Sequence, residues 1–208
     1  MGELLVLHPQ NPQRQFLRKA AEALQAGELI VYPTDSCYAL GCAIGDKEAM
    51  ARLAKIRGVD KHHHFTLVCR DLSEIAKYAK VSNSQYRLLK AATPGAYTFI
   101  LEATREVPKR LMHEKRRTIG IRVPDHPIPR LLLEALGEPL MSSTLLLPGE
   151  PYPLTDAAEI FERIGHQVAC VLDGGHCGLE PTTIVDLSSE TPKLIRQGKG
   201  ELALVGLQ

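Results

Sequence analysis

NPQRQFLRKAAEALQAGELIVYPT, residues 11–34, predicts a helix that leads directly into a strand. Apolar residues recur there at helical spacing, at Phe16, Leu17, Ala20, Ala21 and Leu24. Gly27 is a typical helix stop, and the apolar run that follows it ends at Pro33, as a short buried strand does. A helix joined to a buried strand in this way indicates an α/β fold.

The rest of the chain continues the alternation. Helices are predicted for DKEAMARLAKIR, SQYRLLKAAT, PIPRLLLEALG and TDAAEIFERIG, the last with Thr155 as its N-cap. Strands are predicted for FTLVC, AYTFILEAT, TIGIRV, PLMSST, VACVLDGG, TTIVDL and PKLIRQG. Because the last strands follow one another directly, we expect a mixed parallel and antiparallel sheet with flanking helices. Without a repeat or a linker-like stretch, we expect one domain over residues 1–208.

Composition excludes several classes of protein. The chain has 208 residues, of which 44% are apolar, enough for a substantial core. A net charge of +1 excludes a global field that would attract nucleic acid or a membrane. Five cysteines without paired spacing suggest free thiols in a reducing compartment. No basic leader precedes the first apolar run, and no segment reaches the roughly 18 apolar residues that a membrane span needs, so we expect a cytoplasmic protein.

Polar residues gather where the predicted strands end. The segments are YPTDSCYALGC (32–42), IRVPDHP (121–127), PLMSST (139–144) and EPTTIVDL (180–187). Strand ends of α/β sheets open onto loops whose backbone N–H groups are free to bind ligands. We therefore expect one cleft to collect all four segments.

A cationic stretch, KIRGVDKHHHF (55–65), joins this set. On a continuing helix Lys55 and Arg57 would point about 200° apart, so they converge only if the helix stops at Gly58. The three histidines lack cysteine or carboxylate partners at ligand spacing, and no metal site is expected. We expect them to extend a basic rim that partial protonation assists, with an exposed, uninvolved loop as the alternative.

Taken in order, these motifs resemble the YrdC family of threonylcarbamoyl-adenylate synthases, and in particular its YciO-like branch. The resemblance runs from about residue 12 to residue 200. It rests on YPTDSCYALGC, KIRGVDK, TPGAYTFIL, IGIRVPDHP, PLMSSTLLLPGEP, VLDGG, PTTIVDL and LIRQGK, which follow the family order.

The resemblance implies a twisted mixed sheet with a large basic concave cavity. It also implies a nucleotidyltransferase reaction that joins threonine, bicarbonate and ATP with Mg²⁺. In the family the carbamate of threonine attacks the α-phosphate, pyrophosphate leaves, and threonylcarbamoyl-AMP serves tRNA modification. Positioning and charge neutralisation suffice for such chemistry, and no covalent nucleophile is required.

The resemblance also assigns site residues. Lys55, Arg57 and Lys61 are the catalytic cations, for phosphates or the amino-acid carboxylate. The substrate and nucleotide contacts are Thr34, Tyr38, Arg122, Ser142, Thr144, Thr182 and Arg196. For the hydroxyl residues the alternative is an ordinary structural role at a strand end or cap.

Several positions depart from the family pattern. Leu146 stands where the family has asparagine, Pro148 where it has serine, Gly58 where it has proline, and His62 where it has a small residue or proline. Loss of one hydrogen bond to a nucleotide weakens binding roughly tenfold to hundredfold. A related carbamoyl or acyl adenylate fits the sequence equally well.

A different class of function is RNA binding. REVPKRLMHEKRR (105–117) holds six Lys or Arg residues against Glu106 and Glu114, enough for a local patch that binds tRNA or double-stranded RNA. The aromatic pattern of single-stranded RNA readers is missing. The sequence leaves open whether the chain forms a homodimer.

Overall fold

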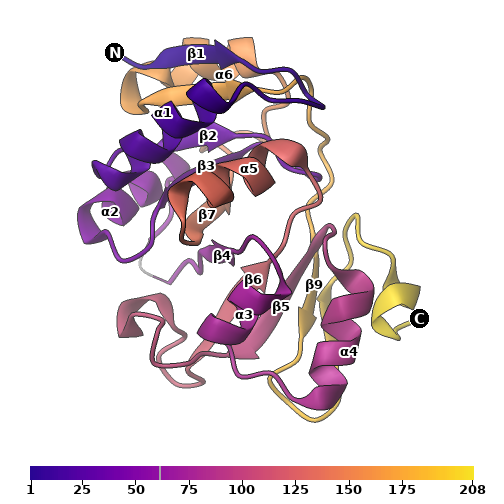
Figure 1. The fold of residues 1–208 in the computed structure, drawn as a ribbon. Helices are drawn as coiled ribbons and strands as arrows, with labels where there is room; N and C mark the ends of the chain where they lie inside the picture. Colours follow the sequence, from indigo (N-terminus) through magenta and orange to yellow (C-terminus); the bar gives the residue numbers. More distant parts are fainter. Residues whose placement is uncertain (61) are drawn as a thin grey trace.

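One mixed sheet organises the chain. The computed structural model describes residues 1–60 and 62–208, and within them ten strands form one sheet in the order β1-β8-β2-β3-β7-β4-β6-β5-β9-β10 (Figure 1). The strands are β1 (Glu3–Val6), β2 (Ile30–Tyr32), β3 (Ala39–Ala43), β4 (Thr66–Val68), β5 (Tyr97–Glu102), β6 (Thr118–Arg122), β7 (Leu140–Thr144), β8 (Cys170–Asp173), β9 (Thr183–Asp186) and β10 (Lys193–Arg196). β1 and β2 pair with β8 in parallel, as β4 does with β6 and β5 with β9. The other neighbours are antiparallel, which confirms the predicted mixed sheet.

Helices and short 3₁₀ turns connect the strands. They are α1 (Arg14–Gln25), α2 (Lys47–Arg57), α3 (Leu72–Tyr78), α4 (Asn83–Ala92), α5 (Pro127–Leu136), α6 (Ala157–Ile164), η1 (Lys109–Leu111), η2 (Gly165–Gln167) and η3 (Leu202–Val205). The sequence missed α3, although Asp71 caps it by accepting the N–H of Glu74. The predicted cap of α6 was also wrong, because Asp156 and not Thr155 accepts the N–H of Glu159.

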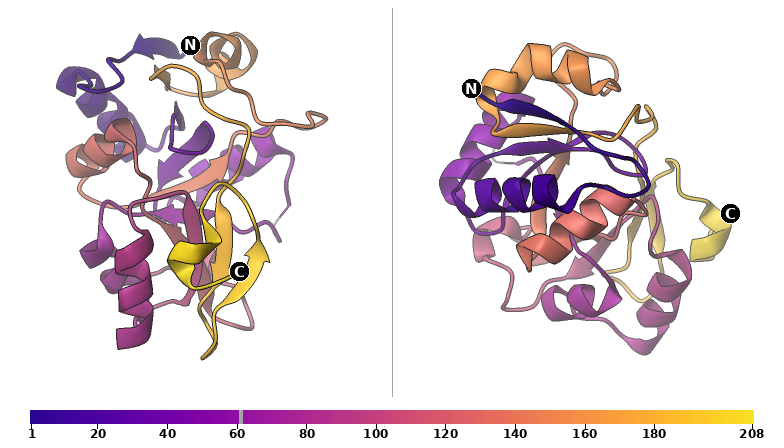
Figure 2. Two further views of the ribbon diagram at one scale, coloured as in Figure 1. Left: turned by 90° about the vertical axis from the view of Figure 1, so that its right-hand side faces the viewer. Right: turned by 45° about the horizontal axis from the view of Figure 1, so that its top comes forward.

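Apolar side chains fill both faces of the sheet. α1 and α5 pack side by side over one face, where Leu24 and Leu132 meet Ile30 (Figure 2). On the opposite face, α2, α3, α4 and α6 bury apolar side chains such as Leu53 against the sheet. Successive residues of a strand point to opposite faces, so Ile30 belongs to the first core and Val31 to the second. Strands buried on both faces read as continuous apolar runs, which explains the sequence of β2.

The end of α2 determines where Arg57 lies. Gly58 adopts the left-handed conformation, with φ of 65°, and ends the helix immediately after Arg57, as the sequence predicted. Asp46 fixes the other end by accepting the N–H of Ala49. The helix therefore delivers its last side chain to the middle of the sheet.

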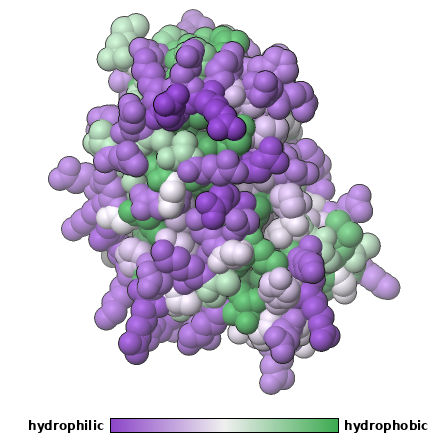
Figure 3. Space-filling view, viewed as in Figure 1, coloured by the Kyte–Doolittle hydropathy of each residue, from purple (hydrophilic) through white to green (hydrophobic). Residues whose placement is uncertain are grey.

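Hydrophilic side chains cover most of the molecular face that carries α1, α3 and α5 (Figure 3). No described helix is long and apolar enough to cross a membrane. The five cysteines are free, four of them buried.

Candidate functional site

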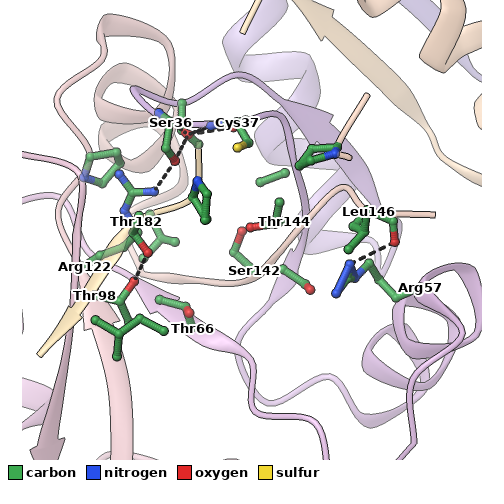
Figure 4. A pocket seen from close by; sticks show the side chains of 18 of the residues that line it. Ser36, Cys37, Arg57, Thr66, Thr98, Arg122, Ser142, Thr144, Leu146 and Thr182 are labelled. Atoms are coloured by element: carbon green, nitrogen blue, oxygen red, sulfur yellow. Dashed lines mark hydrogen bonds between the residues drawn. The ribbon is translucent and has the colours of Figure 1, made fainter. Parts of the chain in front are cut away.

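A cavity of about 510 Å³ opens over the middle of the sheet. Residues from β2, β3, β4, β5, β6, β7, β9 and β10 line it, and the loops after β2 and β7 close its sides (Figure 4). On β4 the alternation is plain: Thr66 and Val68 face the cavity, whereas Leu67 between them is fully buried in the core. The expected convergence of strand ends into one cleft is what the structure shows.

The charge of the lining has one sign. Arg57, Arg122, Arg196, His63 and His64 line the cavity, and no described lining residue is an aspartate or glutamate. Cationic and hydroxyl donors without a carboxylate form an environment for an anionic ligand. The volume lies within the usual range for small-molecule sites.

Arg57 reaches the cavity from the end of α2. Its Nη1 donates a hydrogen bond of 2.9 Å to the carbonyl oxygen of Leu146, while its Nε is buried without a described partner. Burial lowers the pKa of Arg57, although a guanidinium remains charged at neutral pH. One edge of the group is thus held by the loop after β7, and Nη2 is the terminal nitrogen without a described partner.

Lys55 does not join Arg57. It lines a separate surface pocket with Glu28 and Gln167, because the helix continues through Lys55 and two successive steps of about 100° turn it away from Arg57. The expected convergence was wrong, since a stop at Gly58 comes too late to redirect Lys55. Lys61, the third predicted cation, lies outside the described residues.

Arg122 lies across the cavity from Arg57 (Figure 4). Its Nη2 forms a buried ion pair with Asp35 Oδ1, and its Nη1 donates to Ser36 Oγ at 3.2 Å. Asp35 Oδ2 also accepts the N–H of Asp125 at 2.9 Å. Arg122 therefore fixes the loop after β2, while its own Nε is buried without a described partner.

Thr182 and Arg196 form the wall next to Arg122. Arg196 donates from Nε and Nη2 to the carbonyl oxygen of Thr182, at 3.1 and 2.9 Å. The Thr182 hydroxyl lies 2.8 Å from that of Thr98 on β5. Arg196 thus fixes the residue that precedes β9, and both residues border the cavity.

Two predicted hydroxyls serve the fold. Thr34 Oγ1 donates to the carbonyl oxygen of Cys37 at 2.6 Å and accepts the backbone N–H groups of Ser36 and Cys37. Ser142 Oγ lies 2.6 Å from the Tyr32 hydroxyl and donates to the carbonyl oxygen of Leu40. Both side chains line the cavity with Thr144, but their hydroxyls are already engaged.

Tyr38 does not line the cavity. It is fully buried, its hydroxyl donates to the carbonyl oxygen of Gly175 at 2.5 Å, and burial raises its pKa. Cys37, the residue before it in the loop between β2 and β3, lines the cavity instead.

The sequence missed several lining residues, among them Tyr32, Ser36, Thr66 and Thr98. The alternation in FTLVC and AYTFILEAT could have identified Thr66 and Thr98. Each of them lies between two apolar residues that face the core, so its own side chain faces the opposite side of the sheet. Tyr32 is fully buried, and burial raises its pKa to about 12, so its hydroxyl stays protonated as a donor.

His63 and His64 border the cavity, as the predicted rim required. Burial lowers the pKa of both imidazoles; Arg57 lowers that of His63 further, and His113 that of His64. These surroundings disfavour the protonated form of both rings, and their part in binding anions stays a prediction. Among the described residues no group of three side chains is arranged to hold a metal ion.

The basic segment 105–117 is partly engaged within the fold. Arg110 donates to the carbonyl oxygen of Gly45, and Arg116 lies 3.6 Å from Asp186 Oδ2. RNA binding by this segment stays a prediction.

A mixed sheet whose strands surround a cation-lined cavity defines an α/β protein with a cavity suited to an anionic ligand. The Sua5/YciO/YrdC family model, described as "Telomere recombination", matches residues 22–198, and the chain belongs to this family.

Relatives and solved structures agree with this assignment. "Uncharacterized protein YciO" of Escherichia coli K12 is 50% identical over 202 residues, covering 97% of this chain and 98% of that protein. The crystal structure of E. coli YciO covers 99% of this chain and 100% of its own, with a TM-score of 0.94. The threonylcarbamoyl-AMP synthase of Vibrio cholerae is 30% identical over 186 residues, covering 88% and 97%. P. abyssi Sua5 complexed with L-threonine shares the fold at 24% identity, with a TM-score of 0.86, over 94% of this chain and 57% of that one.

Proposed function

We propose that the chain is a nucleotidyltransferase of the threonylcarbamoyl-AMP synthase type. It joins threonine, bicarbonate and ATP, or closely related substrates, into an acyl adenylate and releases pyrophosphate. The observation that carries the proposal is a cavity with three arginines and no described carboxylate, in a family that contains threonylcarbamoyl-AMP synthases.

The chemistry asks mainly for charge neutralisation. The amine of threonine and bicarbonate give a carbamate and water. A carbamate oxygen then attacks the α-phosphorus, and the bond from that phosphorus to pyrophosphate breaks. All reacting groups are anionic, so positioned guanidinium and hydroxyl donors stabilise the transition state.

Arg57 and Arg122 contribute differently to substrate binding. Arg57 binds phosphate oxygens at one end of the cavity through its terminal nitrogen Nη2, since Nη1 is used by Leu146 and Nε is buried. At the other end Arg122 lines the cavity as a cation, but its Nε is buried and its terminal nitrogens hold Asp35 and Ser36. A substrate that spans the cavity therefore meets a cation at each end.

Mg²⁺ fits this site only as part of the substrate. Magnesium sites in proteins use one or two carboxylates, and no described lining residue supplies one. The ion would enter on the phosphate oxygens of ATP and reduce their charge, while hydroxyls such as that of Thr144 lie on the cavity wall.

The departures at Leu146 and Pro148 bear on rate and substrate choice. Leu146 lines the cavity with an apolar side chain and offers only its carbonyl oxygen, which Arg57 already uses. A substrate group that a side-chain amide would bind finds no donor there. This favours a slower threonine reaction or a less polar acyl group.

Pyrophosphate release from ATP tests the proposal. The purified protein is assayed with Mg²⁺ and bicarbonate, with and without L-threonine, beside Arg57→Ala. Arg52→Ala is the matched control, because Arg52 lies on the same helix, is exposed and is absent from the cavity lining. We expect threonine-dependent release that Arg57→Ala lowers at least about a hundredfold and Arg52→Ala leaves unchanged.

Folded protein that binds ATP yet releases no pyrophosphate with threonine would refute the threonine reaction. The same assay with other amino acids then identifies the acyl substrate, and loss of release in Arg52→Ala as well would point to a folding defect.

A further inference from the structure

Three imidazoles gather at the Arg57 end of the cavity. His63 and His64 line it, and the ring of His113 stacks on that of His64, with centroids 5.3 Å apart and an interplanar angle of 26°. Two segments far apart in the sequence, 62–65 and 109–117, meet through this stack. The cluster is additional to the arginines that the proposed reaction uses.

His63 is held in a defined position. Its Nε2 lies 3.3 Å from Ser143 Oγ on β7, and its ring meets the edge of Phe65 at a centroid distance of 5.2 Å. Among the residues that the structure describes, the charged and titratable groups that face it are Arg57, His64 and Asp60. Arg57 and His64 lower the pKa of His63, whereas Asp60, whose Oδ1 accepts the N–H of His62, opposes them.

His64 has a similar environment. Within the described part of the chain, His113 and His62 are the titratable groups that face it, and both lower its pKa. His113 is in turn oriented from its own loop, because its Nδ1 accepts the N–H of Arg116 at 3.2 Å. Partial burial and these neighbouring rings disfavour the protonated form of His64, and a bound anion would favour it.

We propose that His63 and His64, together with Arg57, form a polyphosphate subsite that takes up a proton when it is filled. This rests on the proposed function, whose nucleotide supplies the phosphates. An anion with several charges offsets the repulsion from Arg57 and the neighbouring imidazoles, and a protonated His63 donates a hydrogen bond that the neutral tautomer facing an acceptor lacks.

Proton uptake makes binding depend on pH. For each proton taken up, affinity falls by up to about tenfold per pH unit above the pKa of the free imidazole. The cavity would bind polyphosphate more tightly at pH 6 than at pH 8, in proportion to the histidines that titrate.

Calorimetric titration with inorganic tripolyphosphate, without Mg²⁺, tests the subsite near pH 7. Runs in two buffers of different protonation enthalpy give the number of protons exchanged. The proteins compared are wild type, His63→Gln, His64→Gln and the control His166→Gln, whose exposed side chain lies in a separate pocket. The phosphate groups titrate equally in every run, so differences between proteins report the histidines. A parallel titration with ATP shows whether the nucleoside changes the proton count.

We expect His63→Gln to abolish most of the proton uptake and to weaken binding at pH 6 about tenfold, with His64→Gln intermediate and His166→Gln like wild type. Equal proton uptake in wild type and both cavity variants would overturn the proposal, as would affinity independent of pH.

The two proposals fail separately. Tripolyphosphate binding with histidine-dependent proton uptake, but no amino-acid-dependent pyrophosphate release, keeps the subsite and refutes the reaction. Amino-acid-dependent pyrophosphate release without histidine-dependent proton uptake keeps the reaction and refutes the subsite.

Discussion

Pro148 fills the space in which a side chain on Gly58 would lie. A Cβ on Gly58 would come within 2.6 Å of Pro148 Cγ and 3.3 Å of Pro148 Cβ. Both positions depart from the family pattern, and the structure shows that the two departures are in contact. The family proline cannot occupy position 58 here, because the φ of 65° lies opposite to the value that a proline ring fixes. The pair thus sets the end of α2 and the loop that holds Arg57.

Gly58→Ala should destabilise the protein through both strain and contact. The left-handed conformation costs an alanine about 1 kcal/mol, and the clash adds about 1–3 kcal/mol. Replacing Pro148 by Ala as well should relieve the clash and restore most of the stability that it costs. Urea unfolding of the two single variants and the double variant measures the coupling energy.

Gly137→Ala is the matched control for this cycle. Gly137 ends α5 in the same left-handed conformation, with φ of 77°, and a Cβ added to it would have no neighbouring atom within 4 Å. Its loss of stability reports the backbone strain alone. If Gly58→Ala cost no more than Gly137→Ala, the contact with Pro148 would be energetically irrelevant.

Asp35→Ala should be severely destabilising. Asp35 and Arg122 form a buried ion pair, and removing one partner leaves the other charge without compensation, at about 3–5 kcal/mol. Glu150→Ala breaks the exposed pair of Glu150 with Arg163, 2.8 Å apart, and should cost about 0–1 kcal/mol. If chemical unfolding showed the same loss of unfolding free energy in both variants, the buried ion pair would stabilise the fold no more than the exposed one.

Ser142→Ala should reduce stability even without ligand. It removes the 2.6 Å partner of the fully buried Tyr32 hydroxyl, and an unsatisfied buried hydroxyl costs about 1–3 kcal/mol. Tyr32→Phe in the same protein removes the orphaned group. We expect the double variant to be more stable than Ser142→Ala alone, as thermal unfolding of the set would show; additive losses would contradict the direct bond.

Acid should weaken the cap of α5. His126 Nδ1 accepts the N–H of Ile128 at 3.1 Å, and burial lowers the pKa of His126 below 6.5, partly opposed by Asp35 and Asp125. Below pH 6.5 the unfolded chain therefore binds more protons than the folded one, and the free energy of unfolding falls as pH falls.

His126→Asn keeps a capping oxygen and removes this titration. Unfolding measured between about pH 7.5 and pH 5 should show a shallower loss in the variant than in wild type. Identical slopes would mean that His126 is protonated to the same extent in both states.

Local patterns predicted most of the fold. The apolar spacing of PIPRLLLEALG and the glycine after it were enough for α5, which ends where Gly137 turns left-handed. α3 was missed because seven residues carry little periodic signal, although Asp71 and Glu74 are a recognisable capping pair. Strand order is set by contacts between distant segments, which no local pattern records.

The site was predicted less completely, for a geometric reason. Motif order located Arg57 and Arg122, but only the helix rotation shows that Lys55 points to another surface. Likewise Thr34 and Thr66 are both threonines at the cavity, yet whether a hydroxyl serves the fold or a ligand depends on partners that the fold brings near. For Thr34 those partners are backbone groups of its own loop.

The strand order also bears on how the protein forms during synthesis. β8 lies between β1 and β2, so the first two strands of the chain have no shared neighbour until residues 170–173 have left the ribosome. Until then both present open edges that can pair with other chains. A nascent chain that stops before Cys170 therefore has its N-terminal strands but lacks the strand that joins them, and its exposed strand edges favour aggregation.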